Sequence, residues 1–198
     1  MRLPLRLIGA AVVFLLFALL SVFAERMRTG REFDAVLSSY LSDESLHDAH
    51  DWGTRRGILV VVQREAQQPG MWRWRWLAMF DTRIRFAESS LITRISFTIA
   101  NALPANLNLA LHLPPGVAFT LAARNDLERA APLSEFDSRF PNNLGYIAVS
   151  LPGFNATRTE AIFYIDHFCG LCGGGAYVLM RKTNGVWKVV TEHGTWSS

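Results

Sequence analysis

Residues 145–192 read GYIAVSLPGFNATRTEAIFYIDHFCGLCGGGAYVLMRKTNGVWKVVTE and carry the strongest structural signal in the chain. Three apolar runs in this stretch have the β-branched composition of strands, and each is bounded by turn residues. These runs are 146–151, 159–168 and 176–182. Thr183-Asn184-Gly185 predicts a tight hairpin, because Asn-Gly adopts positive φ at little cost, and a last strand follows over 186–192. The stretch therefore predicts an antiparallel β-meander.

Upstream of the meander, helical spacing becomes common. Phe33, Val36, Leu37, Tyr40 and Leu41 recur with helical periodicity and predict a helix over about 31–47. Two more helices are predicted over 89–101, beginning at Ser89 or Ser90, and over 125–131, beginning at Asn125 or Asp126. Short β-branched runs at 57–63 and 117–121 predict two further strands. The predicted fold is α+β, with an N-terminal membrane or signal helix and then helices packed on an antiparallel β-meander sheet.

The N-terminus has the composition of a targeting segment. Arg2 and Arg6 precede a continuous apolar run without charge from Leu7 to Ala24. The small residue Ala24 suits cleavage by a signal peptidase, and the run is also about long enough to cross a bilayer. We therefore predict that residues 1–24 are either a signal peptide or a transmembrane anchor. The bias of positive charge towards the cytoplasm places residues 25–198, a single predicted domain, on the other side of the membrane.

The bulk composition limits the class of protein. Half of the 198 residues are hydrophobic, which is enough to build a packed core in one domain. Arg2 and Arg6 are two of the 20 basic residues, so residues 25–198 hold 18 basic residues against 17 acidic ones. No domain-wide positive field remains, and we predict no nucleic-acid partner.

The candidate chemistry of the chain is concentrated at Cys169 and Cys172, the only cysteines, which lead into Gly173-Gly174-Gly175. In an oxidising compartment this pair is expected to form a structural disulfide. A redox pair would need a lowered thiolate pKa, usually from a helix N-terminus, whereas a strand is predicted after the glycines. A metal site would use His167, Cys169 and Cys172 as ligands. The disulfide is favoured, and the redox and metal interpretations stay open.

A second feature is the alternation Trp72-Arg73-Trp74-Arg75-Trp76. A period of two predicts a strand over 71–80 with the tryptophans on one face. That face either supplies aromatic mass to the core or forms a surface that contacts a bilayer or stacks on a polymer. The core interpretation is favoured, and the five residues remain candidates for surface binding.

The C-terminal third also resembles a group of uncharacterised exported bacterial proteins. In that group a glycine-phenylalanine-asparagine turn precedes a strand, a cysteine–glycine loop and a closing tryptophan hairpin. The matching segments here are Leu144–Ile147, Gly153-Phe154-Asn155, Glu160–Tyr164, Cys169–Gly175, Tyr177–Met180 and Gly185–Val190. The likeness covers roughly 89–192, and the chain departs from the group in having only Gly170 and Leu171 between its cysteines. The resemblance implies a fold and an exported location, and it implies no activity.

Together these features predict a non-catalytic domain of the bacterial envelope that binds a protein or a polymer, without a cofactor. The alternative is a thiol–disulfide or metal-dependent activity centred on the loop from Cys169 to Cys172. The predicted partners are the membrane, through residues 7–24 if they are retained, and an envelope component. The predicted location is the inner membrane with the domain outside the cytoplasm, or the periplasm or exterior after cleavage.

Overall fold

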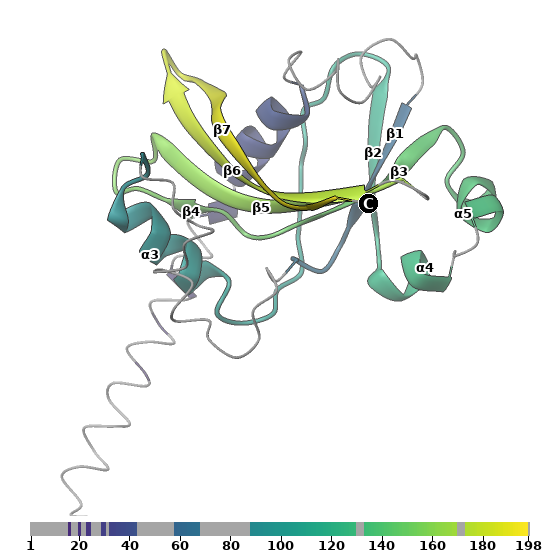
Figure 1. Cartoon of the computed structure of the whole chain (residues 1–198), viewed down its shortest axis with the longest axis horizontal. Coiled ribbons are helices and arrows are strands. Elements are labelled where there is room, and N and C mark those ends of the chain that lie inside the picture. The colour runs from purple at the N-terminus through teal and green to yellow at the C-terminus, as the bar shows by residue number, and fades with distance from the viewer. Residues whose placement is uncertain are drawn as a thin grey trace, which may run out of the picture.

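The computed structural model describes residues 32–42, 58–67, 88–129, 133–169 and 173–197, together with positions 16, 20, 23, 24, 29 and 30 (Figure 1). The predicted tryptophan–arginine strand over 71–80 lies outside these residues, as do Cys172 and nearly all of the apolar run 7–24. Within the described residues, no helix has both the length and the apolar character needed to cross a membrane.

The fold is α+β, as predicted, and its centre is a mixed, mostly antiparallel sheet. The described strands are β1 (Ile58–Gln63), β2 (Val117–Ala122), β3 (Asn143–Val149), β4 (Gly153–Phe154), β5 (Glu160–Phe168), β6 (Gly173–Thr183) and β7 (Val186–Ser197). The main strand order is β2-β1-β3-β5-β6-β7, and β4 pairs with β5.

The sequence predicted a purely antiparallel sheet, and this prediction is wrong for one edge of the sheet. β1 pairs in parallel with both β2 and β3, whereas β3, β5, β6 and β7 pair antiparallel. Parallel neighbours need a long crossover between them. The chain provides one between β1 and β2 by passing through α3 (Leu91–Ala100) and the irregular segment that follows it. The antiparallel meander predicted from 145–192 is confirmed.

The largest core lies on one face of the sheet, under a helix that the structure describes over 32–41. This helix buries Phe33, Val36 and Leu37, as its periodicity predicted. Tyr40 meets Phe163 of β5 edge to face, with ring centroids 5.3 Å apart. The remainder of the helix predicted to residue 47 lies outside the described residues.

The other face of the sheet receives α3. Ser90 caps this helix by accepting a hydrogen bond from the Thr93 backbone N–H, which confirms one of the two predicted caps. Because side chains alternate along β5, Ile162 and Tyr164 point towards α3 while Phe163 points into the large core. Phe97 of α3 packs with Ile162 and Tyr164 in a second, smaller core. In Figure 1, α3 lies at one edge of the molecule, far from α4 and α5.

Two short helices cover the parallel edge of the sheet. α4 (Arg124–Arg129) begins earlier than predicted, so that Asn125 and Asp126 lie inside the helix and are not its caps. Asp126 instead forms an ion pair with Arg139 at 3.1 Å. Arg139 is the last residue of α5 (Leu133–Arg139), a helix that was not predicted from the sequence. The ion pair joins the two helices, and Leu127 and Phe136 pack with Val61 of β1.

The closing hairpin is longer than predicted. Asn184 and Gly185 have φ of 53° and 83°, which confirms the predicted Asn-Gly turn. However, β6 begins at Gly173, so the three glycines are part of a strand and not of a loop. β7 continues to Ser197, beyond the predicted end at residue 192, and pairs with the glycines. All three glycines pair with β5, Gly174 and Gly175 also pair with β7, and this part of β6 has no side chains.

Candidate functional site

A buried carboxyl group lies beside the cysteine–glycine segment. Asp166 of β5 is only 4% exposed. Its Oδ1 accepts hydrogen bonds from the Tyr164 hydroxyl at 2.7 Å and from the Trp196 indole N–H at 2.8 Å. Its Oδ2 accepts a bond from the Gln67 amide at 2.7 Å. We refer to Gln67, Tyr164, Asp166, Thr195 and Trp196 as the Asp166 cluster.

The glycines of β6 make this cluster possible. Gly175 pairs with Asp166 on one side and with Trp196 on the other, so Trp196 and Asp166 are separated by a whole strand. The indole crosses over β6 to reach the carboxyl group. A Cβ added to Gly175 would lie 2.3 Å from the indole nitrogen and 2.4 Å from Asp166 Oδ1. The absence of a side chain at this position is therefore a geometric requirement of the Trp196–Asp166 bond.

The tyrosine of the cluster remains a hydrogen-bond donor. Burial raises the pKa of Tyr164, and although the bond with Thr195 acts in the opposite direction, neighbouring Asp166 raises the pKa further. The Thr195 hydroxyl lies 3.2 Å from the Tyr164 hydroxyl and donates to the Gly175 carbonyl at 3.0 Å. The Tyr164 hydroxyl also accepts a bond from the Trp196 indole N–H at 3.3 Å. The cluster thus contains one carboxyl group, Asp166, surrounded by neutral groups that donate to it or bond to one another, which is an arrangement that holds strands together.

An aromatic row extends from the cluster across the sheet. Tyr146 of β3 stacks on Phe168 of β5 with centroids 4.6 Å apart, and Phe168 meets Trp196 of β7 at 5.7 Å. Burial, together with the charges of Glu128 and Asp166, raises the pKa of Tyr146. Trp196 is the outermost ring and is 39% exposed. The row ends in an aromatic ring whose position is fixed and whose outer face is accessible.

Only some of the site residues predicted from the sequence lie near the Asp166 cluster. Cys169 directly follows β5, and no free cysteine occurs among the residues that the structure describes. His167 alternates to the face of β5 opposite Asp166. In the described parts of the chain, no three His, Cys, Asp or Glu side chains are grouped closely enough to hold a metal. Since Cys172 lies outside them, the pairing of the two cysteines and the metal set with His167 stay predictions. The same is true of the surface formed by Trp72, Arg73, Trp74, Arg75 and Trp76.

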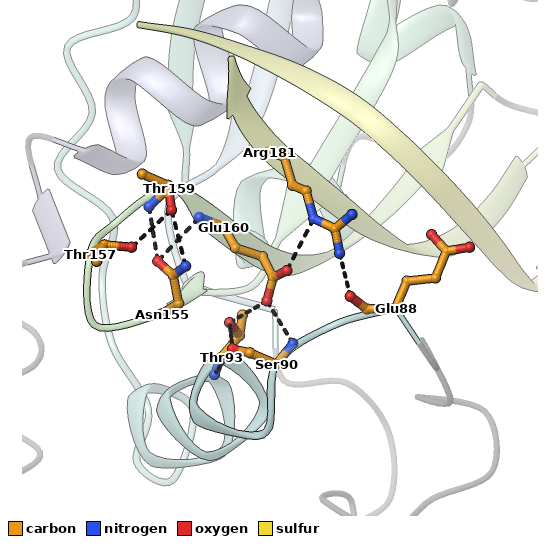
Figure 2. Close-up of polar contacts among 8 residues, drawn as sticks. All are labelled: Glu88, Ser90, Thr93, Asn155, Thr157, Thr159, Glu160 and Arg181. Atoms are coloured by element: carbon orange, nitrogen blue, oxygen red, sulfur yellow. Dashed lines mark hydrogen bonds and ion pairs between the residues drawn. The ribbon is translucent and has the colours of Figure 1, made fainter. Parts of the chain in front are cut away.

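A second buried carboxyl group, Glu160, fastens α3 to the sheet (Figure 2). Glu160 is 6% exposed and accepts hydrogen bonds from the Ser90 N–H and the Thr93 hydroxyl, each at 2.7 Å. Arg181 of β6 pairs with its other oxygen at 3.2 Å and also donates to the Glu88 carbonyl. These contacts join the start of α3 to both β5 and β6.

Glu160 is expected to give the fold a measurable pH dependence. Burial alone would raise the pKa of Glu160, but hydrogen bonds from Thr93, Ser90 and Arg181 outweigh it and hold the pKa below its ordinary value. A carboxyl group of this kind stabilises the fold above its unfolded pKa of about 4.3, and the contribution is lost as pH falls through the folded pKa. Glu160→Gln should lower the free energy of unfolding by about 1 kcal/mol at neutral pH, and by less below about pH 4.

Urea unfolding at pH 7 and at pH 3 measures this difference. Glu128→Gln, at an exposed position near the end of α4, is the control and should lower the free energy of unfolding at neither pH. An equal loss of stability at both pH values for Glu160→Gln would show that the charge of Glu160 does not stabilise the fold.

Comparison with protein-family models, with curated proteins and with solved structures finds no match to this chain.

Proposed function

We propose that this chain is a non-catalytic domain of the bacterial envelope that binds a protein or polymer partner outside the cytoplasm. It would be either anchored by residues 7–24 or released after cleavage. The observation that carries the proposal is the Trp196 ring, which is 39% exposed and is held across the glycines of β6 by a hydrogen bond to a buried carboxyl group. Exposed aromatic rings with a fixed position are the usual anchors of binding surfaces.

The geometry favours binding because the ring is already ordered before a partner arrives. An interface side chain that must be immobilised on binding costs about 0.5–1.5 kcal/mol. Trp196 avoids much of this cost, since its N–H is bonded to Asp166 and its ring contacts Phe168. Asp166 also needs no rearrangement when a partner binds, because both of its oxygens already accept bonds from neighbouring side chains.

The cysteines fit the same proposal as a structural disulfide that closes the turn between β5 and β6. Cys169 lies at the end of β5, and Trp196 packs beside Gly173 at the start of β6. A disulfide at this turn would hold β5 and β6 together beside the exposed ring of Trp196. The apolar run 7–24 predicts export to an oxidising compartment, where such a disulfide persists.

Site-specific photo-crosslinking in the native envelope tests the proposal. A photoreactive amino acid at His193, an exposed position on the side of β7 that faces the same way as Tyr177, should give a discrete adduct. The same group at Lys188, exposed and pointing the same way on the same strand, should not. Trp196→Ala should remove the adduct formed from position 193 because the anchor of the surface is lost.

Equal adducts from both positions, or none from position 193, would contradict a binding surface at Trp196.

Intact mass measured after immediate blocking of thiols separates the two functional classes. A mass short by two hydrogens supports the structural disulfide. Free, fast-reacting thiols or bound zinc would favour the alternative, a thiol–disulfide or metal-dependent activity that uses Cys169, Cys172 and His167.

A further inference from the structure

We propose that the outer side of α3 lies on the surface of the lipid bilayer, with Leu91, Ile92 and Ile95 inserted at the level of the headgroups. The inference rests on the proposed anchoring of the chain by residues 7–24. It adds a second membrane contact, made by the folded domain itself, and it sets the orientation of that domain.

The helix is apolar on two sides, and only one of them serves the fold. Phe97 and Ala100 are buried against the sheet. Leu91, Ile92 and Ile95 are 54%, 56% and 37% exposed. Clustered large apolar side chains of this kind on a surface mark a contact with a partner or a membrane. The one charged residue of α3 is Arg94, a partly buried side chain whose positive sign suits anionic headgroups.

The position of α3 relative to the N-terminal segment favours the bilayer as the occupant. Two consecutive residues of β6 connect the two regions. Arg181 donates to the Glu88 carbonyl just before α3 and pairs with Glu160, which accepts bonds from the start of α3. Lys182 pairs with Glu32 at 3.3 Å. The beginning of α3 and the point where the chain enters the folded domain therefore lie at the same end of β6.

The length of chain between the apolar run and Glu32 is short. Eight residues lead from Ala24 to Glu32. They reach about 12 Å if helical and at most about 28 Å if extended. If residues 7–24 are embedded, Glu32 lies close to the bilayer surface, and Leu91 and Ile92 are brought to it as well.

The described positions within the apolar run are consistent with lipid contact. Leu16, Leu20 and Phe23 are helical and are 54%, 64% and 63% exposed. Their spacing places them along one side of a helix. Exposed apolar side chains thus occur both in the predicted anchor and on α3, and a bilayer is one surface that accepts both.

Depth-dependent fluorescence quenching tests the inference on the full-length chain in vesicles of phosphatidylethanolamine and phosphatidylglycerol. An environment-sensitive fluorescent amino acid is placed at position 92, at position 16, or at position 125. Asn125 is exposed on α4, at the far side of the molecule from α3 (Figure 1). Spin-labelled lipids should quench most of the fluorescence from positions 16 and 92 and leave position 125 unchanged.

Each other outcome overturns a distinct part of the proposal. Quenching at position 16 with none at position 92, and access of iodide to position 92, would leave the anchoring intact and refute the α3 contact. Protection of position 92 from both lipid and aqueous quenchers would show that protein covers α3. Absence of lipid quenching at position 16 would refute the anchoring and the inference together. Ile92→Glu, at an exposed site that the fold does not need, should abolish lipid quenching of a label at position 95 and leave position 16 quenched.

Discussion

Replacement of Gly153 by alanine is expected to separate α3 from the sheet and to lower the free energy of unfolding by at least about 3 kcal/mol. Gly153 lies in β4, where α3 crosses the chain at very close range. A Cβ at this position would lie 2.1 Å from the Phe97 nitrogen and 2.4 Å from its Cα. These are backbone atoms in the middle of a helix, so no side-chain rotation relieves the overlap and the whole helix must move.

Movement of α3 would also break hydrogen bonds at the same contact. The Ser96 hydroxyl accepts a buried bond from the Phe154 N–H at 2.9 Å. The Asn101 side chain accepts a bond from the Leu151 N–H at 3.0 Å and donates to the Leu151 carbonyl at 2.8 Å. Each buried group left without a partner costs about 1–3 kcal/mol, so the loss is expected to exceed that of a simple overlap.

Urea unfolding of purified variants checks this prediction. Gly194→Ala is the control, because a Cβ there meets nothing within 4 Å. Since Gly153→Ala is expected to be poorly soluble, Ser96→Ala provides a milder variant, with an expected loss of about 1–2 kcal/mol. If Gly153→Ala were as stable as Gly194→Ala, the close packing of β4 against α3 would be wrong.

The sequence predicted the elements whose signals are local. The meander could be recognised because its strands alternate with turn residues, and α3 could be recognised from Ser90 and its apolar spacing. The parallel pairing of β1 with β2 and β3 could not be recognised, because it depends on contacts between residues far apart in the chain. α5 was missed because it is short, although Pro132 directly before Leu133 and Glu135 in the first turn are typical of a helix start.

The start of β6 shows how a long-range contact can reverse the meaning of a local signal. Consecutive glycines normally indicate a loop. Here Gly173–Gly175 pair with β5, and Gly174 and Gly175 also pair with β7. The ring of Trp196 occupies the space that side chains at positions 173 and 175 would fill. No property of the glycines themselves identifies a tryptophan more than twenty residues later as the side chain that covers them.

The candidate site was only partly accessible from sequence. The cysteine spacing directed attention to the correct end of β5, but the Asp166 cluster was not predicted. One signal was available: Asp166 is an acidic residue at the end of the apolar run Ala161–Ile165, and a carboxyl group buried in a strand needs hydrogen-bond donors. The donors could not be identified, because Gln67 lies 99 residues away and Trp196 lies two strands away.

Gly175→Ala should disrupt the Asp166 cluster and lower the free energy of unfolding by about 2–3 kcal/mol. The added Cβ would lie 2.3 Å from both the Trp196 indole nitrogen and the Tyr164 hydroxyl. These atoms belong to rigid rings that pack against other side chains, so the overlap is relieved only by displacing the indole from Asp166. Gly194→Ala is the control, since a Cβ at this position of β7 meets nothing within 4 Å.

Two readouts separate a local effect on Trp196 from a general loss of stability. The indole N–H resonance of Trp196, assigned with Trp196→Phe, should shift in Gly175→Ala and stay in place in Gly194→Ala. The crosslink from position 193 should weaken in the same variant, because the exposed ring no longer has a fixed position. An unchanged indole resonance would refute the steric argument. A shifted resonance with an unchanged crosslink would show that Asp166 orients Trp196 for the stability of the sheet and not for a partner.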